Sequence, residues 1–274
     1  MQVACMKKYW HVLNIGIQNN LTYRFNYLAR TLFGLIPLTA VLLLWRTIYS
    51  GKGGDATVSS YTLAQMISYY LLVTVVDALT AVNEDDWQIA TDIKDGNISQ
   101  FLLKPVDYLW FRFSLFLSGR LTYLTMAFIP VALVILLLRD QFILPPDPAT
   151  LAFFLLSVAL TALLQFFLAY AMAMLAFWVM EISTFVFILY AFEYIASGHM
   201  FPLDILPETI RNLLLHFTPF PYQLYLPVGI YLGKISGAQM LIGLITQAGW
   251  VLAAFCLARF AWNRGIKHYA AAGG

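Results

Sequence analysis

The sequence predicts an all-α polytopic membrane protein with six transmembrane helices in a single transmembrane domain over residues 1–274. Of these residues, 61% are hydrophobic and only 11% are charged, and the mean hydropathy is +0.75. Soluble domains carry roughly 25% charged residues, so this chain lacks the polar surface that a water-exposed globule needs. Apolar runs of about twenty residues, long enough to cross a hydrocarbon core, recur along it. We therefore expect the lipid bilayer as its surroundings and no nucleic-acid partner.

The N-terminal segment predicts a helix over residues 6–28 that lies in the membrane interface. One helical stripe of this segment is apolar, whereas Lys8 and His11 point elsewhere. The stripe consists of Trp10, Leu13, Ile17 and Leu21. A first span is expected to follow at about 31–49.

The other predicted spans are separated by polar or proline-rich segments. We place them at about 60–81, 116–138, 149–178, 182–200 and 236–258. The segment RDQFILPPDP, which follows the third span, contains three prolines and cannot continue a helix. The stretch of thirty residues at 149–178 is about 45 Å long as a helix, against a hydrocarbon core of about 30 Å, so this span must tilt or protrude.

Residues 201–234 predict an extracellular segment that re-enters the outer leaflet. The segment is apolar and aromatic, but its prolines prevent a single helix from crossing the membrane there. We expect a short helix at about 207–217, because Pro207 and Glu208 suit a first helical turn. Irregular backbone at membrane depth requires surrounding protein or a water-filled cavity.

The distribution of basic residues predicts the orientation of the chain. Eleven of the sixteen Lys and Arg residues lie on the side that holds both ends of the chain, and five lie on the other side. Cytoplasmic loops carry an excess of these residues. We therefore expect both termini in the cytoplasm and the protein in the cell's inner (plasma) membrane.

Residues 82–108 form a polar island between the second and third spans. The island holds six of the fourteen carboxylates of the chain, and we interpret it as a cytoplasmic loop of two short helices. Ile89 and Ile93 lie one turn apart on the first helix. Ile98, Phe101 and Leu102 have helical spacing on the second. So many apolar side chains favour docking on another protein over an ordinary solvated loop.

Ionisable residues inside the predicted spans are few, and burying them in lipid is unfavourable. Asp77 lies near Arg112 or Arg120 in the predicted arrangement, which favours a structural ion pair. Glu193 either lines a translocation path or gate, or has a structural role. Tyr190, Tyr194, His199 or Arg46 could then satisfy it. The sequence shows neither a catalytic set nor a metal-ligand motif, so we expect no catalytic residue and no metal site.

Three tyrosines in the proline-rich segment leave two interpretations open. Tyr222, Tyr225 and Tyr231 belong most simply to the aromatic belt at the outer membrane interface. Their clustering with prolines also suits an extracellular gate.

Two stretches make the chain resemble the permease subunits of ABC transporters of the ABC-2 type. TDIKDGNISQFLLKPVDYLWFRF is similar to the family's cytoplasmic loop. SGHMFPLDILP followed by TPFPYQLYLPVGIYLGK is similar to its segment after the fifth span. The order of interfacial helix, six spans, loop and re-entrant element covers essentially the whole chain.

The resemblance implies an exporter permease that pairs with a second permease, as a homodimer or heterodimer, and with two separate ATPase subunits. ATP and Mg would be bound by those ATPases, and this chain would bind no cofactor. The island would be the coupling helix. Introduction of a charged side chain at Ile98 or Phe101 should then uncouple transport without unfolding the spans. The expected coupling residues are Ile89, Ile93, Asp95, Gly96, Ile98, Phe101 and Leu102. The expected path or gate residues are Glu193, His199, Phe201, Pro202 and Tyr222.

Two alternative functions belong to other classes of protein. A secondary transporter or channel that works without ATP should show repeated halves with interrupted helices in corresponding positions, and we see no repeat. An intramembrane enzyme or assembly factor should display a catalytic pair inside the spans, and none is visible.

Overall fold

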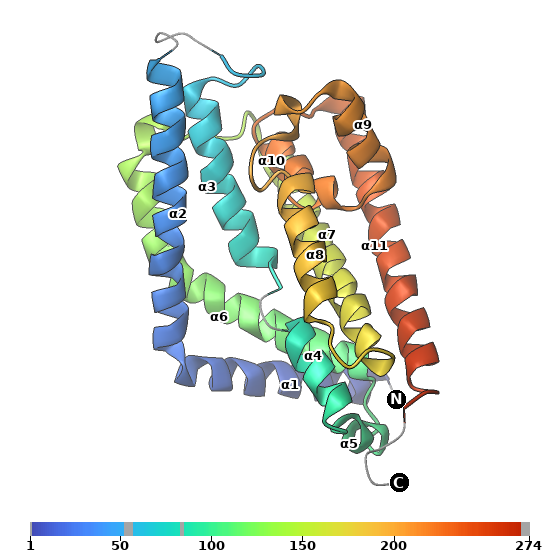
Figure 1. Cartoon of the computed structure of the whole chain (residues 1–274). Coiled ribbons are helices and arrows are strands. Elements are labelled where there is room, and N and C mark those ends of the chain that lie inside the picture. The colour runs from blue at the N-terminus through green and yellow to red at the C-terminus, as the bar shows by residue number, and fades with distance from the viewer. Residues whose placement is uncertain (1, 52–56, 83–84, 270–274) are drawn as a thin grey trace.

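The computed structural model describes residues 2–51, 57–82 and 85–269. Residues 52–56 of the loop after the first span and residues 83 and 84 of the island therefore lie outside the described residues. Long helices run side by side through the bundle (Figure 1). They are α2 (Arg24–Ser50), α3 (Leu63–Thr80), α6 (Tyr108–Leu137), α7 (Pro148–Ala173) and α11 (Gly237–Gly265). All five are long and apolar enough to cross a membrane, which confirms the all-α polytopic membrane class.

The fifth predicted span, 182–200, corresponds to a shorter helix. This helix, α8 (Ser183–Ala196), has 14 residues, which is about 21 Å of helix against a hydrocarbon core of about 30 Å. The described residues thus contain five candidate spans and a shorter apolar helix. The number of six spans stays a prediction.

Helix α1 (Gln2–Thr22) lies across one end of the bundle, roughly perpendicular to α2 (Figure 1). The bend is at Tyr23, so the boundary predicted between 28 and 31 is wrong, and residues 24–28 belong to the span. The inner side of α1 packs on α6: Leu13 is buried, and a Cβ atom at Gly16 would collide with Ser118. Close packing thus holds the middle of α1 against α6.

Helix α6 begins eight residues before the predicted start of the third span. The side chain of Asp107 accepts a hydrogen bond from the backbone N of Trp110 and caps the helix. Residues 108–115, which lie before the predicted start of the span, therefore form the first two turns of α6. Pro130 lies inside α6 without ending it.

Helices α7 and α11 pack closely against each other. Gln247 of α11 is fully buried. It accepts a hydrogen bond from Ser157 at 2.9 Å and donates one to the backbone O of Tyr222 at 2.8 Å. The hydrogen bonds of Gln247 thus join α7, α11 and the proline-rich segment inside an otherwise apolar core. At its C-terminal end, α7 continues as a 3-10 turn, η2 (Met174–Phe177).

The proline-rich segment folds into short helical pieces at the end of the bundle opposite to α1 (Figure 1). These pieces are η3 (Leu203–Ile205), α9 (Glu208–Phe217), η4 (Phe220–Tyr222) and α10 (Tyr225–Tyr231). The predicted helix at 207–217 is thus confirmed as α9. The loop between α6 and α7, with its 3-10 turn η1 (Arg139–Gln141), lies at this end too.

Candidate functional site

The island folds as the two short helices that the sequence predicts. They are α4 (Asp85–Lys94) and α5 (Ile98–Leu102), at the same end of the bundle as α1 (Figure 1), and α4 packs on α7 and η2. Gly96 between them has φ = +78°, a backbone conformation that favours glycine. Tyr269, which follows α11, donates a hydrogen bond of 2.8 Å to the backbone O of Gly96. The turn between the two helices is therefore attached to the C-terminal end of the bundle.

Three predicted docking residues of the island are buried within the chain itself. Ile89, Ile93 and Ile98 are 1%, 5% and 0% exposed and belong to the main hydrophobic core. They hold α4 and α5 against the bundle and are not available at its surface.

Most described carboxylates of the island also face inward. Asp86 accepts a hydrogen bond of 2.6 Å from Tyr190 of α8. Asp107 forms an ion pair of 2.6 Å with Arg259 of α11. Asp92 pairs with Arg112 of α6 at 3.8 Å. These contacts connect the island to three helices of the bundle, whereas Asp95 is exposed.

The outer surface of the island is the end of α5. Phe101 is half-buried and packs on Tyr108, with ring centroids 5.0 Å apart. Leu102 is 53% exposed and Leu103 is 89% exposed. A rigidly held apolar tip of this kind suits docking on another protein, and we name Leu102 and Leu103 the island tip.

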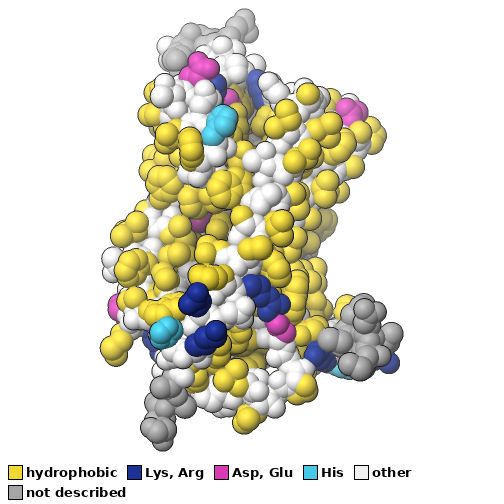
Figure 2. All heavy atoms as spheres, turned by 90° about the vertical axis from the view of Figure 1, so that its right-hand side faces the viewer, with side chains coloured by type: hydrophobic (Ala, Val, Ile, Leu, Met, Phe, Trp, Pro, Cys, Tyr) yellow, Lys and Arg dark blue, Asp and Glu magenta, His cyan; other side chains and the backbone are white. Residues whose placement is uncertain are grey.

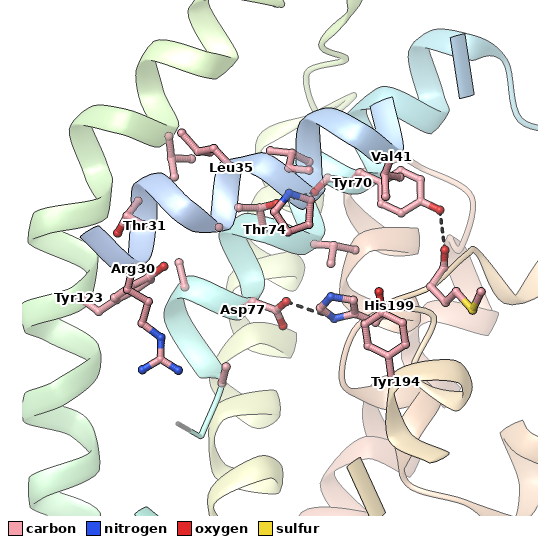
Figure 3. Close-up of a pocket in the computed structure, with 18 of the residues that line it drawn as sticks. Arg30, Thr31, Leu35, Val41, Tyr70, Thr74, Asp77, Tyr123, Tyr194 and His199 are labelled. Atoms are coloured by element: carbon pink, nitrogen blue, oxygen red, sulfur yellow. Dashed lines mark hydrogen bonds and ion pairs between the residues drawn. The ribbon is translucent and has the colours of Figure 1, made fainter. Parts of the chain in front are cut away.

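Inside the bundle, Asp77 pairs with a residue that the sequence did not indicate as its partner. Its Oδ2 lies 3.2 Å from Nδ1 of His199 (Figure 3). The expected pairing with Arg112 is wrong, because that guanidinium pairs with Asp92. Arg120 lines the same cavity, with its guanidinium over the ring of Tyr123, and its positive charge acts favourably on the Asp77 carboxylate.

The cavity around this pair has a volume of about 270 Å³ and lies between α2, α3, α6 and the segment after α8. Its walls are mainly apolar, as the labelled Leu35 and Val41 show in Figure 3. Tyr70 donates a hydrogen bond of 2.7 Å to the backbone O of Met200. This bond fixes the segment that carries His199 against α3.

Three of the four expected partners of Glu193 have other partners. Tyr190 donates to Asp86, His199 pairs with Asp77, and Arg46 donates to Gln141 at 3.0 Å. Glu193 lines a second cavity, which also contains Asp77, His199 and Tyr194, the fourth expected partner. Satisfaction of Glu193 by Tyr194 stays a prediction.

The other predicted gate residues lie in the proline-rich segment. Phe201 is half-buried and Pro202 is buried. Tyr222, Tyr225 and Tyr231 are 7%, 8% and 7% exposed, so they do not form an exposed aromatic belt. Burial of their rings between short helices, rather than contact with the interface, explains why aromatic residues follow the prolines here.

Asp204 is a structural centre that the sequence reasoning missed. Its carboxylate accepts hydrogen bonds of 2.9 Å from both Tyr61 and Tyr225 and lies 3.3 Å from Arg211. A single acid between prolines was its only sequence signal, and Tyr61 is 143 residues away in the chain. This cluster connects the start of α3 to the proline-rich segment.

Comparison with known proteins gives one family. A family model described as "ABC-2 family transporter protein" matches residues 35–273, which is most of the chain. No curated protein and no solved structure matches.

Proposed function

Because the chain belongs to the ABC-2 family of transporter proteins, a family of transmembrane permease components, we propose that it is the permease subunit of an ATP-driven exporter. In this proposal it pairs with a second permease, as a homodimer or heterodimer. Two separate ATPase subunits bind ATP and Mg, and this chain binds no cofactor. The observation that carries the proposal is the island tip, an exposed apolar surface on a loop that is firmly tied to the bundle.

The proposed orientation places both termini, α4 and α5 in the cytoplasm, with the protein in the inner (plasma) membrane. The distribution of charge supports it. On the face shown in Figure 2, hydrophobic side chains cover the middle, and most Lys and Arg side chains lie toward the lower end. This is the end at which Figure 1 shows α1, α4 and α5. An excess of basic residues marks cytoplasmic segments.

The contacts of the island suggest how movement of an ATPase would reach the spans. In this mechanism, ATP binding closes the ATPase pair and moves α4 and α5. The interactions of Asp86 with Tyr190, Asp92 with Arg112 and Asp107 with Arg259 then carry this movement to α8, α6 and α11. Rigid elements joined by short polar contacts transmit displacement in this way.

The proposed substrate is hydrophobic or amphipathic, and its path lies between the two permeases. The chain would contribute the path or gate residues Glu193, His199, Phe201, Pro202 and Tyr222. The walls of the cavity in Figure 3 are mainly apolar but also carry the Asp77–His199 pair, Arg30 and Arg120, which supports a substrate of this class.

Purification of the tagged chain from its host in a mild detergent tests this proposal. Mass spectrometry of the purified material should identify an ATP-binding subunit, together with one or two kinds of permease chain. Transport in membrane vesicles should require ATP. If the chain is recovered only with itself, and its transport survives ATP depletion, the exporter assignment fails.

A further inference from the structure

The second cavity differs from the one in Figure 3 in its charged side chains, because Arg30 and Arg120 line only the first. It has a volume of about 250 Å³ and lies between α3, α7, α8 and the segment before α10. The two cavities share Asp77, Ala81, Tyr194 and His199. The Asp77–His199 pair therefore lies where the two cavities meet.

The charges that face the second cavity are negative. Asp77 and Glu193 line it, and its described lining residues include no Lys or Arg. His199 lies against Asp77, but Glu193 forms no ion pair with a described residue. A carboxylate without a compensating partner at membrane depth is unfavourable, and such a residue marks a functional site.

Two buried amides add unpaired hydrogen-bonding groups to the same walls. Gln223 is 1% exposed, and Gln165 is 8% exposed. The Gln223 side chain approaches the Glu193 carboxyl group, but neither its Nε2 nor its Oε1 reaches hydrogen-bonding geometry. Oε1 of Gln165 also has no hydrogen-bond partner. Because buried polar groups are nearly always hydrogen-bonded, these atoms indicate a polar guest in the cavity.

We propose that the second cavity binds a protonated amine, and that the apolar body of the same molecule extends into the adjacent cavity. An ammonium group carries three donors and no acceptor. The carboxylates of Asp77 and Glu193 and the unpaired amide oxygens of Gln165 and Gln223 supply the acceptors. Binding of this amine is independent of the proposed function. Only its role as the transported substrate rests on that proposal.

Binding of 1-aminoadamantane tests the inference, because this molecule joins one amine to a compact apolar body. The full-length chain, with any partners that purify with it, is placed in phosphatidylcholine nanodiscs without nucleotide. Equilibrium dialysis with the radiolabelled amine should show saturable binding. 1-Adamantanol and 1-adamantanecarboxylate have the same body without the ammonium group, and neither should compete. Competition by either as strong as that of the unlabelled amine would overturn the inference without any mutation.

Variants then locate the site. Glu193→Gln should weaken amine binding by about ten- to a hundredfold, as expected when a charge-assisted hydrogen bond is lost, and Asp77→Asn should also weaken it. Glu181→Gln is the matched control, because Glu181 is exposed and lies just before α8. Equal binding by the Glu193→Gln variant and the control would overturn the inference.

The lipid composition of the nanodiscs distinguishes two sources of the amine, a lipid headgroup and a free amphipathic molecule. Phosphatidylethanolamine carries a primary amine in its headgroup. Displacement of the probe in nanodiscs that contain this lipid would identify a membrane lipid as the ligand, and undiminished binding would identify a free amphipathic amine. The assay uses no nucleotide, so failure of amine binding leaves the permease assignment intact, and failure to recover an ATPase leaves this result intact.

Discussion

Leu103→Asp is the substitution that tests the island tip most directly. Leu103 is 89% exposed, so the change should alter the free energy of unfolding of the chain by no more than about 0.5 kcal/mol. Burying a leucine side chain in a partner's cleft is worth about 1.5–3 kcal/mol. Loss of about 2 kcal/mol weakens ATPase binding about thirtyfold. Biolayer interferometry of the purified ATPase on immobilised permease would measure this change.

The control for this substitution is Leu144→Asp. Leu144 is 73% exposed and lies in the loop between α6 and α7, at the opposite end of the bundle. It should leave ATPase binding unchanged, while both variants keep the melting temperature of the wild type. The reasoning is refuted if Leu103→Asp binds the ATPase as tightly as the wild type, or if Leu144→Asp weakens binding equally.

Three further substitutions test the packing of the described residues, each by the melting temperature of the detergent-solubilised chain. Ile98→Asp should lower the melting temperature and reduce the folded yield, because this substitution places an unpaired charge at a position that is 0% exposed. The cost in stability is about 3 kcal/mol or more. A wild-type melting temperature would contradict the burial of Ile98. Asp204→Ala removes the acceptor of two tyrosine hydroxyl groups and should cost about 2–4 kcal/mol, with a smaller loss in Asp204→Asn; equal stability of both variants would show that the cluster contributes little. Gly265→Ala should destabilise the chain by about 1–3 kcal/mol, because the new Cβ atom would meet the ring of Phe177. The control Gly249→Ala has free space for a Cβ atom and should not destabilise the chain. Similar melting temperatures for the two variants would argue against the close contact at Gly265.

The behaviour expected at Ile98 shows where reasoning from periodicity reaches its limit. The spacing of Ile89, Ile93 and Ile98 predicts apolar faces on two helices, and the structure confirms both helices. An apolar helix face must be buried against another surface, but the sequence does not say whether that surface belongs to the same chain or to a partner. A charged side chain at Ile98 was therefore expected to leave the fold intact, whereas the burial of Ile98 against the bundle predicts destabilisation.

Polar pairing inside the spans is a second property that sequence alone did not decide. Asp77 and His199 are 122 positions apart and meet only because α3 packs beside the segment after α8 (Figure 3). Arg112, a nearer candidate in the sequence, is held by Asp92 instead. Each cation had several possible acceptors in the sequence, and the packing of the helices determines which of them it meets.

The sequence by itself determined the membrane class, the approximate positions of the long helices, the island with its two short helices and the broken segment after α8. Hydropathy, helical spacing and proline are local properties, and they act whatever the rest of the chain does. Only the tertiary structure decided that Leu103 is exposed while Ile98 is buried, and that Glu193 faces a cavity with Asp77. These facts depend on which helices pack together, and a helix of given amphipathicity can bury its apolar face against several neighbours.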